Sequence, residues 1–390
     1  MKINSVDIKG VGGIKKIHLE FNDHLNVICG TNGVGKTTIL EAIITGFSSS
    51  SIRLKRNVKC NCADVNINFT NSDGVKRDSK YSVVQFTPNN EISTPPRTVT
   101  ESEHVFYFRT ERQIEYKQLP GVMKDRTSSV NQIARSSIDG IQAEDIKQWF
   151  VNRDLYIDKN DSLTETQKQN YYIAVRNFSI MDPTIKFKKV EAASLEILLE
   201  TSKGDILFEY LSAGYKSCIY ILFGIIKEIE FRFKNPSIYI RDFNGIILID
   251  EIDIHLHPHW QAKLIVALKE LLPKAQIIAT THSPSILQVL EKHEIIPLED
   301  DVDNGVSIKE LNLGDYGLQG WTLEEILTDV MGVPSTSSRL FTDAIKDFDD
   351  ALAEENVEKI NSAYELLDEM LHPNSNLRRI LKIQMAGLEE

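Results

Sequence analysis

The sequence predicts an α/β protein in which a mixed β-sheet carries polar groups at the ends of its strands. Two observations favour this fold class. A glycine-rich loop, residues 30–37, stands between a short apolar segment and a segment with helical periodicity. Two further apolar runs end at Asp250-Glu251 and at His282. Because such runs are typical of buried parallel strands, we expect a ligand at the carboxyl edge of the sheet.

The composition narrows the classes of protein that are possible. The chain has 390 residues, of which 42% are apolar, and a formal net charge of -12. This charge disfavours general attraction to nucleic acid or anionic membranes, although a local basic patch could still bind either. No apolar run approaches membrane-span length, and four cysteines in so long a chain make no disulfide framework. We expect reduced thiols and a cytoplasmic protein without a membrane partner.

Alternation of apolar and polar residues predicts an antiparallel β-subdomain in the first part of the chain. Its strands are expected at 3–8, 17–21, 65–69 and 81–86, with a turn at 71–74. The alternation is typical of strands that bury one face and expose the other to solvent.

Helical spacing of apolar residues predicts a helical insertion at about 114–190, before the chain returns to the sheet. We assign residues 1–313 to one nucleotide-binding domain. Residues 314–390 form a helical C-terminal region, which either caps this domain or serves as a partner-docking or oligomerisation element.

Residues 30–37 fit the P-loop pattern G-x-x-x-x-G-K-[ST] at every fixed position. Its glycines let backbone N–H groups turn toward phosphates, and the following helix directs its positive dipole end to them. Lys36 is expected to reach the β and γ phosphates, and the Thr37 hydroxyl to bind Mg²⁺. The sequence thus predicts ATP and Mg²⁺ as ligands. The expected nucleotide-binding residues are Asn32, Gly33, Gly35, Lys36, Thr37 and Thr38.

A second anion site is indicated at Leu211-Ser212-Ala213-Gly214-Tyr215-Lys216, where another helix is expected to start. The serine hydroxyl, the glycine N–H and the helix dipole converge there on one anion. In its place between the P-loop and the Asp-Glu strand, this string resembles the signature of the ABC ATPase superfamily. The resemblance implies that the signature grips the γ-phosphate held by another copy, through Leu211, Ser212, Gly214 and Lys216.

The same resemblance assigns roles to the residues that follow the two apolar runs. It implies that Asp250 holds Mg²⁺ together with Thr37, and that Glu251 polarises the attacking water. His282 matches the switch histidine, which senses the γ-phosphate. Two hydrolysis residues, Glu251 and His282, are therefore expected.

Two further loops of the family have counterparts in this chain. His255 and His257 match the D-loop, written H-L-H-P-x-W-Q, which packs across a dimer interface; zinc binding by alternating histidines is the weaker alternative. The Q-loop glutamine, which senses Mg²⁺, has no single match. Arg112 or Gln113 is the candidate, and Gln85 is the weaker one.

The stretch 315–327, followed by Met331-Gly332-Val333, resembles the tail of Septu-type ATPases, including those of retron-associated Septu systems. The resemblance implies an anti-phage sensor that hydrolyses ATP slowly, pairs head to tail through nucleotide and controls a separate nuclease, with an HNH nuclease favoured. Asp301-Val302-Asp303 lacks the surrounding domain of a nuclease site, so cleavage is expected from the partner. Contact with DNA or a retron RNA-DNA stays open.

Three other functions stay open at this point. One is a DNA-repair or recombination ATPase that acts directly on DNA, and another is an ATPase partner of a TOPRIM nuclease in another defence system. The third is a structural scaffold that keeps ATP bound without turnover. Basic residues between 53 and 59 could touch nucleic acid, although a solvated loop is favoured. Cys60 and Cys62 form a lone C-x-C string, which lacks the second pair of a specific zinc site.

Overall fold

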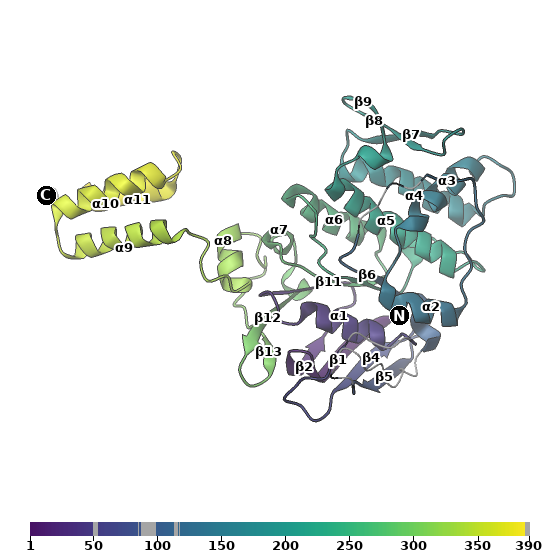
Figure 1. Ribbon diagram of the computed structural model, residues 1–390, viewed down its shortest axis with the longest axis horizontal. Helices are drawn as coiled ribbons and strands as arrows, with labels where there is room; N and C mark the ends of the chain where they lie inside the picture. Colours follow the sequence, from purple (N-terminus) through teal and green to yellow (C-terminus); the bar gives the residue numbers. More distant parts are fainter. Residues whose placement is uncertain (50–53, 85, 87–98, 113–115, 117, 387–390) are drawn as a thin grey trace. The chain divides into compact units, whose positions relative to one another are not determined.

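The computed structural model describes residues 1–49, 54–84, 86, 99–112, 116 and 118–386. The chain forms two compact units, which are Met1–Gly332 and Val333–Glu390 (Figure 1). We call them the N-terminal unit and the C-terminal unit. In the described part of the chain, no helix is long and apolar enough to cross a membrane.

The central sheet of the N-terminal unit has the strand order β13-β12-β3-β11-β10-β6. All neighbours are parallel except β13, which runs antiparallel to β12. Four of the strands, β3, β6, β10 and β11, are buried along their whole length, which explains their continuous apolar sequences. The bounds are β3 Leu25–Gly30, β6 Val105–Phe108, β10 Ile246–Ile249, β11 Gln276–Thr280, β12 Ile295–Asp301 and β13 Gly305–Ile308.

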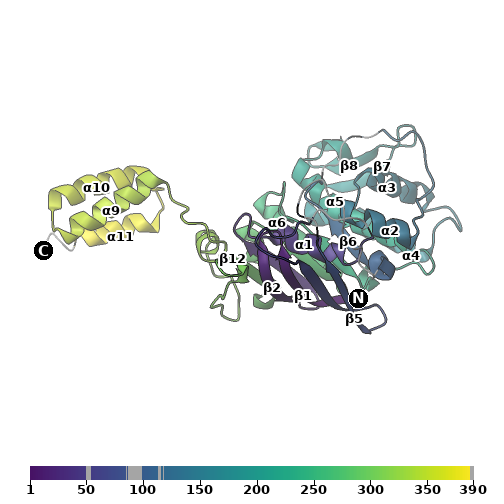
Figure 2. The ribbon, with the colours of Figure 1, turned by 60° about the horizontal axis from the view of Figure 1, so that its bottom comes forward.

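An antiparallel sheet of order β2-β1-β4-β5 lies on one side of the central sheet, with helix α1 (Lys36–Thr45) between them (Figures 1 and 2). Apolar side chains from both sheets and from α1 share one core. Val6 and Ile8 enter it from β1, and Ile39 and Ile43 from α1. The bounds are β1 Lys2–Val11, β2 Ile14–Glu20, β4 Asp64–Thr70 and β5 Lys76–Ser82.

The last strand of this sheet differs from the expectation. A strand was predicted at 81–86, whereas β5 pairs with β4 from Lys76 onward. Asn71 accounts for the early start, because its side-chain Oδ1 accepts the N–H groups of Asp73 and Val75 and closes a tight turn. The strand was missed because only Ser79 and Tyr81 of β5 are buried, which leaves almost no apolar alternation.

Helices cover the opposite face of the central sheet (Figure 1). Trp149, Phe150, Phe178 and Phe223 pack together there with ring centroids 5.2 to 6.4 Å apart. A small sheet of order β7-β8-β9 borders this layer. The predicted mixed sheet, antiparallel subdomain and helical insertion are thus confirmed. The bounds are α2 Val130–Ser136, α3 Glu144–Tyr156, α4 Glu165–Met181, α5 Ala213–Arg232, α6 Pro258–Leu271, α7 Pro284–Leu287, β7 Lys186–Val190, β8 Ile197–Thr201 and β9 Gly204–Leu207.

The N-terminal unit ends at Gly332 rather than at the boundary of 313 expected from the sequence. The reason is packing, because Leu318, Ile326 and Val330 are buried in the helical core of this unit, around α8 (Leu323–Glu325). The C-terminal unit is helical, as predicted, and has a core of its own. Its helices are α9 Arg339–Ala353, α10 Val357–Met370 and α11 Asn376–Ala386.

Candidate functional site

The P-loop joins β3 to α1 and has the backbone of a phosphate cradle. Gly30, Gly33 and Gly35 have φ values of 141°, 82° and 105°, in the region that favours glycine. A Cβ on Gly30 would lie 2.3 Å from the Leu298 carbonyl oxygen, so only glycine fits there. Gly35 caps α1 without a side-chain hydrogen bond, which leaves the first N–H groups of the helix for an anion.

Lys36 is buried and folds back over this loop. Its Nζ donates to the carbonyl oxygens of Gly30, at 3.0 Å, and Thr31, at 2.8 Å. Burial lowers the pKa of the Lys36 ammonium, and the carboxylates of Glu251 and Asp250 oppose that shift. The Lys36 side chain thus lies in the phosphate loop and donates to two neutral acceptors, which a phosphate can replace. Asn32 and Gly33 are exposed at the same loop.

Thr37 and Asp250 lie together, as the sequence predicts for a pair of Mg²⁺ ligands. The Thr37 hydroxyl donates to Asp250 Oδ1 at 3.1 Å. Thr280, at the end of β11, donates its hydroxyl to the same oxygen at 2.6 Å. A hydroxyl and a carboxylate oxygen beside the phosphate cradle are hard oxygen donors, so these residues fit Mg²⁺.

Glu251 follows Asp250 in an unusual backbone conformation, with φ of 45°. Its N–H donates to Thr280 Oγ1 at 2.7 Å, so one threonine side chain contacts both acidic residues. Partial burial, with the nearby carboxylates of Asp250 and Asp253, raises the pKa of Glu251. The raised pKa makes this carboxylate a better proton acceptor than an exposed glutamate.

The Arg112 side chain contacts the backbone of the two acidic residues, Asp250 and Glu251. Its guanidinium donates to the backbone carbonyl oxygens of Asp250 and Glu251, the latter at 3.2 Å. Burial lowers the pKa of Arg112 to about 10, so the side chain stays charged at neutral pH. The other two Q-loop candidates, Gln113 and Gln85, lie outside the described residues.

His282 is half-buried just after β11. Its backbone N–H donates to Asp253 Oδ1 at 3.1 Å, and the Thr281 hydroxyl donates to the same oxygen at 2.5 Å. Burial and the positive charge of Lys36 lower the pKa of His282 below 6.5, so its imidazole is neutral at pH 7. Sequence reasoning missed Asp253 and Thr280 as anchors, although both stand within predicted motifs.

The signature forms the start of α5, as predicted. Ser212 is exposed and caps the helix, where its Oγ accepts the N–H of Tyr215 at 3.3 Å. Leu211 is buried, and Lys216 Nζ donates to the carbonyl oxygen of Glu209 at 3.0 Å. Gly214 is also buried, and a Cβ there would lie 2.6 Å from the His255 carbonyl oxygen. The signature and the predicted D-loop therefore pack directly against each other.

The D-loop histidines do not form a cluster of ligands. His255 is exposed with φ of 64°, and His257 caps α6, where its Nδ1 accepts the N–H of His259 at 3.3 Å. Across the described residues, no group of three or more His, Cys, Asp and Glu side chains could hold a metal ion. All four cysteines are free thiols, with Cys29 and Cys218 buried.

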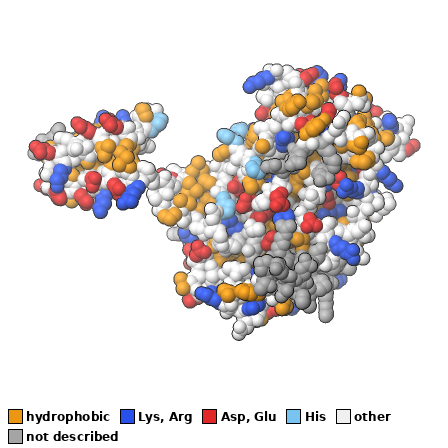
Figure 3. Space-filling view, in the orientation of Figure 1, with side chains coloured by type: hydrophobic (Ala, Val, Ile, Leu, Met, Phe, Trp, Pro, Cys, Tyr) orange, Lys and Arg blue, Asp and Glu red, His pale blue; other side chains and the backbone are white. Residues whose placement is uncertain are grey.

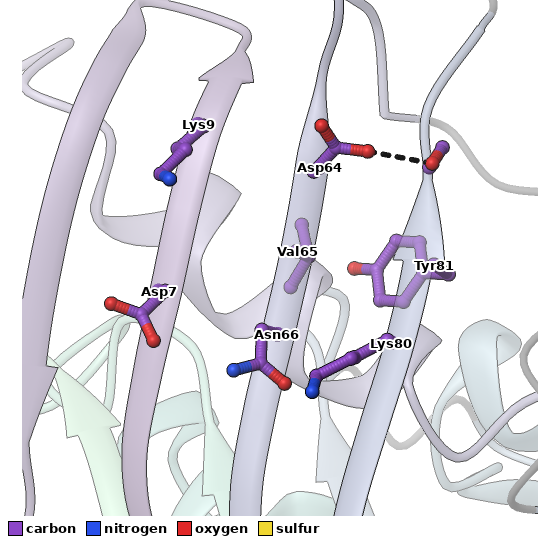
Figure 4. Close-up of a pocket in the computed structure, with 8 residues that line it drawn as sticks. Asp7, Lys9, Asp64, Val65, Asn66, Lys80 and Tyr81 are labelled. Carbon is purple, nitrogen blue, oxygen red and sulfur yellow. Dashed lines mark hydrogen bonds between the residues drawn. The ribbon is translucent and has the colours of Figure 1, made fainter.

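A separate hollow of about 460 Å³ lies on the exposed face of the antiparallel sheet (Figure 4). Lysine and aspartate side chains of β1, β4 and β5 alternate along it, and the Ser82 hydroxyl donates to Asp64 Oδ1 at 2.6 Å. Its charges are mixed, and it contains none of the predicted site residues. Figure 3 shows the same interspersion of charges over one face of the N-terminal unit.

The arrangement of P-loop, buried Asp-Glu strand, following histidine and signature helix defines the class of ABC-type P-loop ATPase folds. A protein-family profile described as "AAA domain, putative AbiEii toxin, Type IV TA system" matches residues 67–288. The chain is 45% identical over 386 residues to the Septu protein PtuA of Bacillus thuringiensis, which covers 98% of each protein. It belongs to the Septu PtuA family.

More distant similarities were also found. The chain is 25% identical to "Retron Vc95 probable ATPase" of Vibrio cholerae serotype O1 biovar El Tor, over 75% of this chain and 72% of that protein. Among solved structures, an Smc head bound to the C-winged helix domain of ScpA is 19% identical, with a TM-score of 0.47, over 80% of this chain and 98% of that one.

Proposed function

We propose that this chain is the ATP-hydrolysing subunit of a cytoplasmic anti-phage complex, and that pairing of two copies through ATP controls a separate nuclease. Membership of the Septu PtuA family supports the role in defence, and the Septu resemblance favours an HNH nuclease as partner. The P-loop, with its paired Thr37 and Asp250, supports Mg²⁺-dependent ATP binding.

We propose a task for each site residue. Lys36 and the N–H groups at the start of α1 hold the β and γ phosphates, and Glu251 accepts the proton of the water that attacks the γ-phosphorus. His282, neutral at pH 7, donates a hydrogen bond to the γ-phosphate. When bound by Thr37 and Asp250, Mg²⁺ offsets the negative charge of the phosphates.

One observation carries the proposal that two copies act together. The P-loop side of the site is already linked by hydrogen bonds within the chain, whereas the Ser212 hydroxyl at the start of α5 is exposed. In the described residues, the side-chain hydrogen bonds of Ser212 and Lys216 join them to neighbours on their own segment, Tyr215 and Glu209. We propose that a second copy presents this signature to the nucleotide.

Mixing two inactive variants tests this proposal. Lys36→Ala weakens ATP binding, and Ser212→Arg blocks the signature, so each purified chain alone should lose turnover at an ATP concentration that saturates wild type but not Lys36→Ala. In a mixture, the intact P-loop of one chain meets the intact signature of the other, and ATP hydrolysis should return. A mixture no more active than its components would overturn the pairing.

The C-terminal unit is proposed as the partner-docking or oligomerisation element. Apolar side chains on its surface support this role, since Ile380 is 51% and Ile383 is 71% exposed on α11, and Figure 3 shows apolar side chains beside charged ones on one face. We propose co-expression of the full chain with its neighbouring genes, followed by mass measurement. Ile380→Glu with Ile383→Glu should reduce the mass of the complex while ATP binding persists; an unchanged complex would contradict the proposal.

The same experiment separates defence from DNA repair. A nuclease that copurifies with the chain, and whose cleavage depends on ATP, supports the proposed function. Tight ATP-dependent binding to DNA ends without any nuclease subunit would favour a repair ATPase instead.

A further inference from the structure

The strand end that carries the two acidic residues is held from both sides. On the β11 side, Thr280 Oγ1 accepts the Glu251 N–H, and the Ile252 N–H donates to the Thr280 carbonyl oxygen at 2.9 Å. On the β6 side, the sheet ladder stops where the Asp250 N–H donates to the Phe108 carbonyl oxygen at 2.8 Å. Beyond that point the carbonyl group of Asp250 needs another donor, whereas the Glu251 carbonyl oxygen accepts the Ile254 N–H at 2.9 Å.

Arg112 supplies the donor for Asp250 and a second donor for Glu251. The residue follows β6, and its Nε donates to the Arg109 carbonyl oxygen at 2.8 Å, which fixes the guanidinium next to β10. From there one Nη2 group reaches both the Asp250 and the Glu251 carbonyl oxygens. The side chain is only 2% exposed, so these bonds are shielded from water.

The bonds matter because Glu251 is in the left-handed region, with φ of 45°. A non-glycine residue there is strained by about 1–3 kcal/mol and persists only where its surroundings hold it. Without Arg112 the Asp250 carbonyl group would lose this donor, and the Glu251 carbonyl group would keep the Ile254 N–H alone. The peptide between them could then relax and redirect the Glu251 side chain. The direction of that side chain therefore depends on the donors that hold its backbone.

A second buried arginine shows that Arg112 is not an ordinary ion-pair partner. Arg153, on α3, donates to carboxylate oxygens of Glu230 and Asp125, both at 2.7 Å. Arg112 instead donates to carbonyl oxygens, and its Nη1, buried, has no hydrogen-bond partner in the described structure. A buried donor left unpaired costs about 1–3 kcal/mol, so stability alone is a poor reason for an arginine at this place.

We infer that Arg112 is a positioning residue for ATP hydrolysis, which holds the Asp250 and Glu251 peptide groups so that the Glu251 carboxylate keeps its place beside the phosphate cradle. The inference rests on the proposed ATPase function and deepens it. Its role differs from that of a Q-loop residue, because it acts on the backbone of the acidic strand rather than on Mg²⁺ or nucleotide.

Substitution of Arg112 tests the inference through a split between kcat and KM. Arg112→Gln should lower kcat about 10- to 100-fold, since a misplacement of about 1 Å is enough for such a loss. KM and the Kd for ATP should change less than about threefold, because the P-loop is untouched. Arg112→Lys keeps a donor near the carbonyl groups and should recover part of kcat, and it serves if the glutamine variant does not fold.

Arg153→Gln is the matched control. It also removes a buried guanidinium, so it should lower the melting temperature while folded molecules keep the wild-type kcat. A second test combines Arg112→Gln with Glu251→Gln. If Arg112 acts through Glu251, the double variant should hydrolyse ATP at nearly the rate of Glu251→Gln alone in single-turnover assays.

Several results would overturn the inference. An unchanged kcat in both Arg112 variants would overturn it and leave the ATPase function intact. A raised KM with normal kcat would also overturn it, because Arg112 would then contribute to nucleotide binding. Equal losses of kcat in the Arg112 and Arg153 variants would mean that Arg112 only stabilises the fold. A wild-type complex without any turnover would overturn the proposed function and this inference together.

Discussion

The carboxyl edge of the central sheet and the start of α5 are both expected to face nucleotide, yet they are built differently. At the sheet edge, Asp250 and Thr280 are buried and bonded to each other, and Thr281 is buried against Asp253. At the start of α5, Ser212 is exposed, and within the described part of the chain its hydroxyl group makes one hydrogen bond, the capping bond with Tyr215. One region is arranged in advance by the chain itself, whereas the other presents its groups outward.

The difference indicates which chemistry each region can perform alone. Groups that hydrogen bonds hold in place need little reorganisation when charge develops in the transition state. The side chains at the sheet edge are held in place in this way. The Ser212 hydroxyl of the signature is not, so its contribution depends on the molecule that covers it. Changes at the sheet edge should therefore act on chemistry or on binding within one chain, and changes at α5 should act through a second copy.

The largest expected effect is that of Glu251→Gln, which removes the proton acceptor and keeps the shape of the side chain. We expect kcat to fall about 10²- to 10⁴-fold, the usual contribution of a general base. ATP binding should persist, so paired chains should accumulate with ATP in mass measurements. A chain that remains monomeric with ATP in this variant would contradict the pairing through the signature.

Lys36→Ala should act on binding rather than on the chemical step. The loss of a charged hydrogen bond of about 1.5–3 kcal/mol corresponds to roughly 10- to 100-fold weaker ATP binding. Titration calorimetry with ATP and Mg²⁺ would measure it. Lys55→Ala, on the same unit but outside the P-loop, is the control and should bind ATP normally. Equal affinities in the two variants would rule out the P-loop as the main phosphate site.

Thr280→Val tests whether the sheet edge is truly arranged in advance. Valine keeps the shape but removes the hydroxyl that joins Asp250 Oδ1 to the Glu251 N–H. We expect kcat to fall on the order of tenfold through misplacement of the carboxylates. Stability should fall by about 1–3 kcal/mol, because two buried polar groups lose a partner. Thr280→Ser restores the hydroxyl and should recover both quantities; no recovery would mean that packing of the methyl group dominates.

The contrast between the regions also explains what sequence could predict. Residues 30–37 and the strand before Asp250 were predicted because strand, loop and helix leave clear local patterns. The roles of Thr280 and Arg112 depend on contacts between strands that are far apart in the chain, and no local pattern encodes them. Sequence could have singled out Thr280 only through its place at the end of a strand next to β10.

The misplaced strand and unit boundary have similar causes. Strand β5 has few apolar residues, so its position depends on pairing with β4 and on the turn at Asn71. The boundary moved past 313 because Leu318 and Ile326 enter a core made by distant helices. In both cases tertiary packing decided a boundary that the local pattern left undetermined.

The smallest expected effect concerns the far end of α5, where the helix that carries the signature is anchored. Burial raises the pKa of Glu228, but Lys227 and Arg232 outweigh it and lower the pKa to about 2. Their nitrogens lie 3.0 and 2.9 Å from its carboxylate oxygens. Glu228→Gln should lower stability by about 1–3 kcal/mol, because Lys227 is left as a buried cation without its carboxylate.

The pH dependence of this loss follows from the direction of the shift. A carboxyl group with a lowered folded-state pKa contributes fully above its ordinary value of 4.5 and loses that contribution as pH falls toward 2. Urea unfolding of wild type and Glu228→Gln should therefore differ equally at pH 8 and pH 6, and less at pH 4. ATP turnover at neutral pH should match wild type, because the start of α5 is unchanged. A loss of turnover would mean that the ion pairs at the C-terminal end of α5 also fix the position of the signature at its N-terminal end. The contrast between the signature and the sheet edge would then be smaller than proposed.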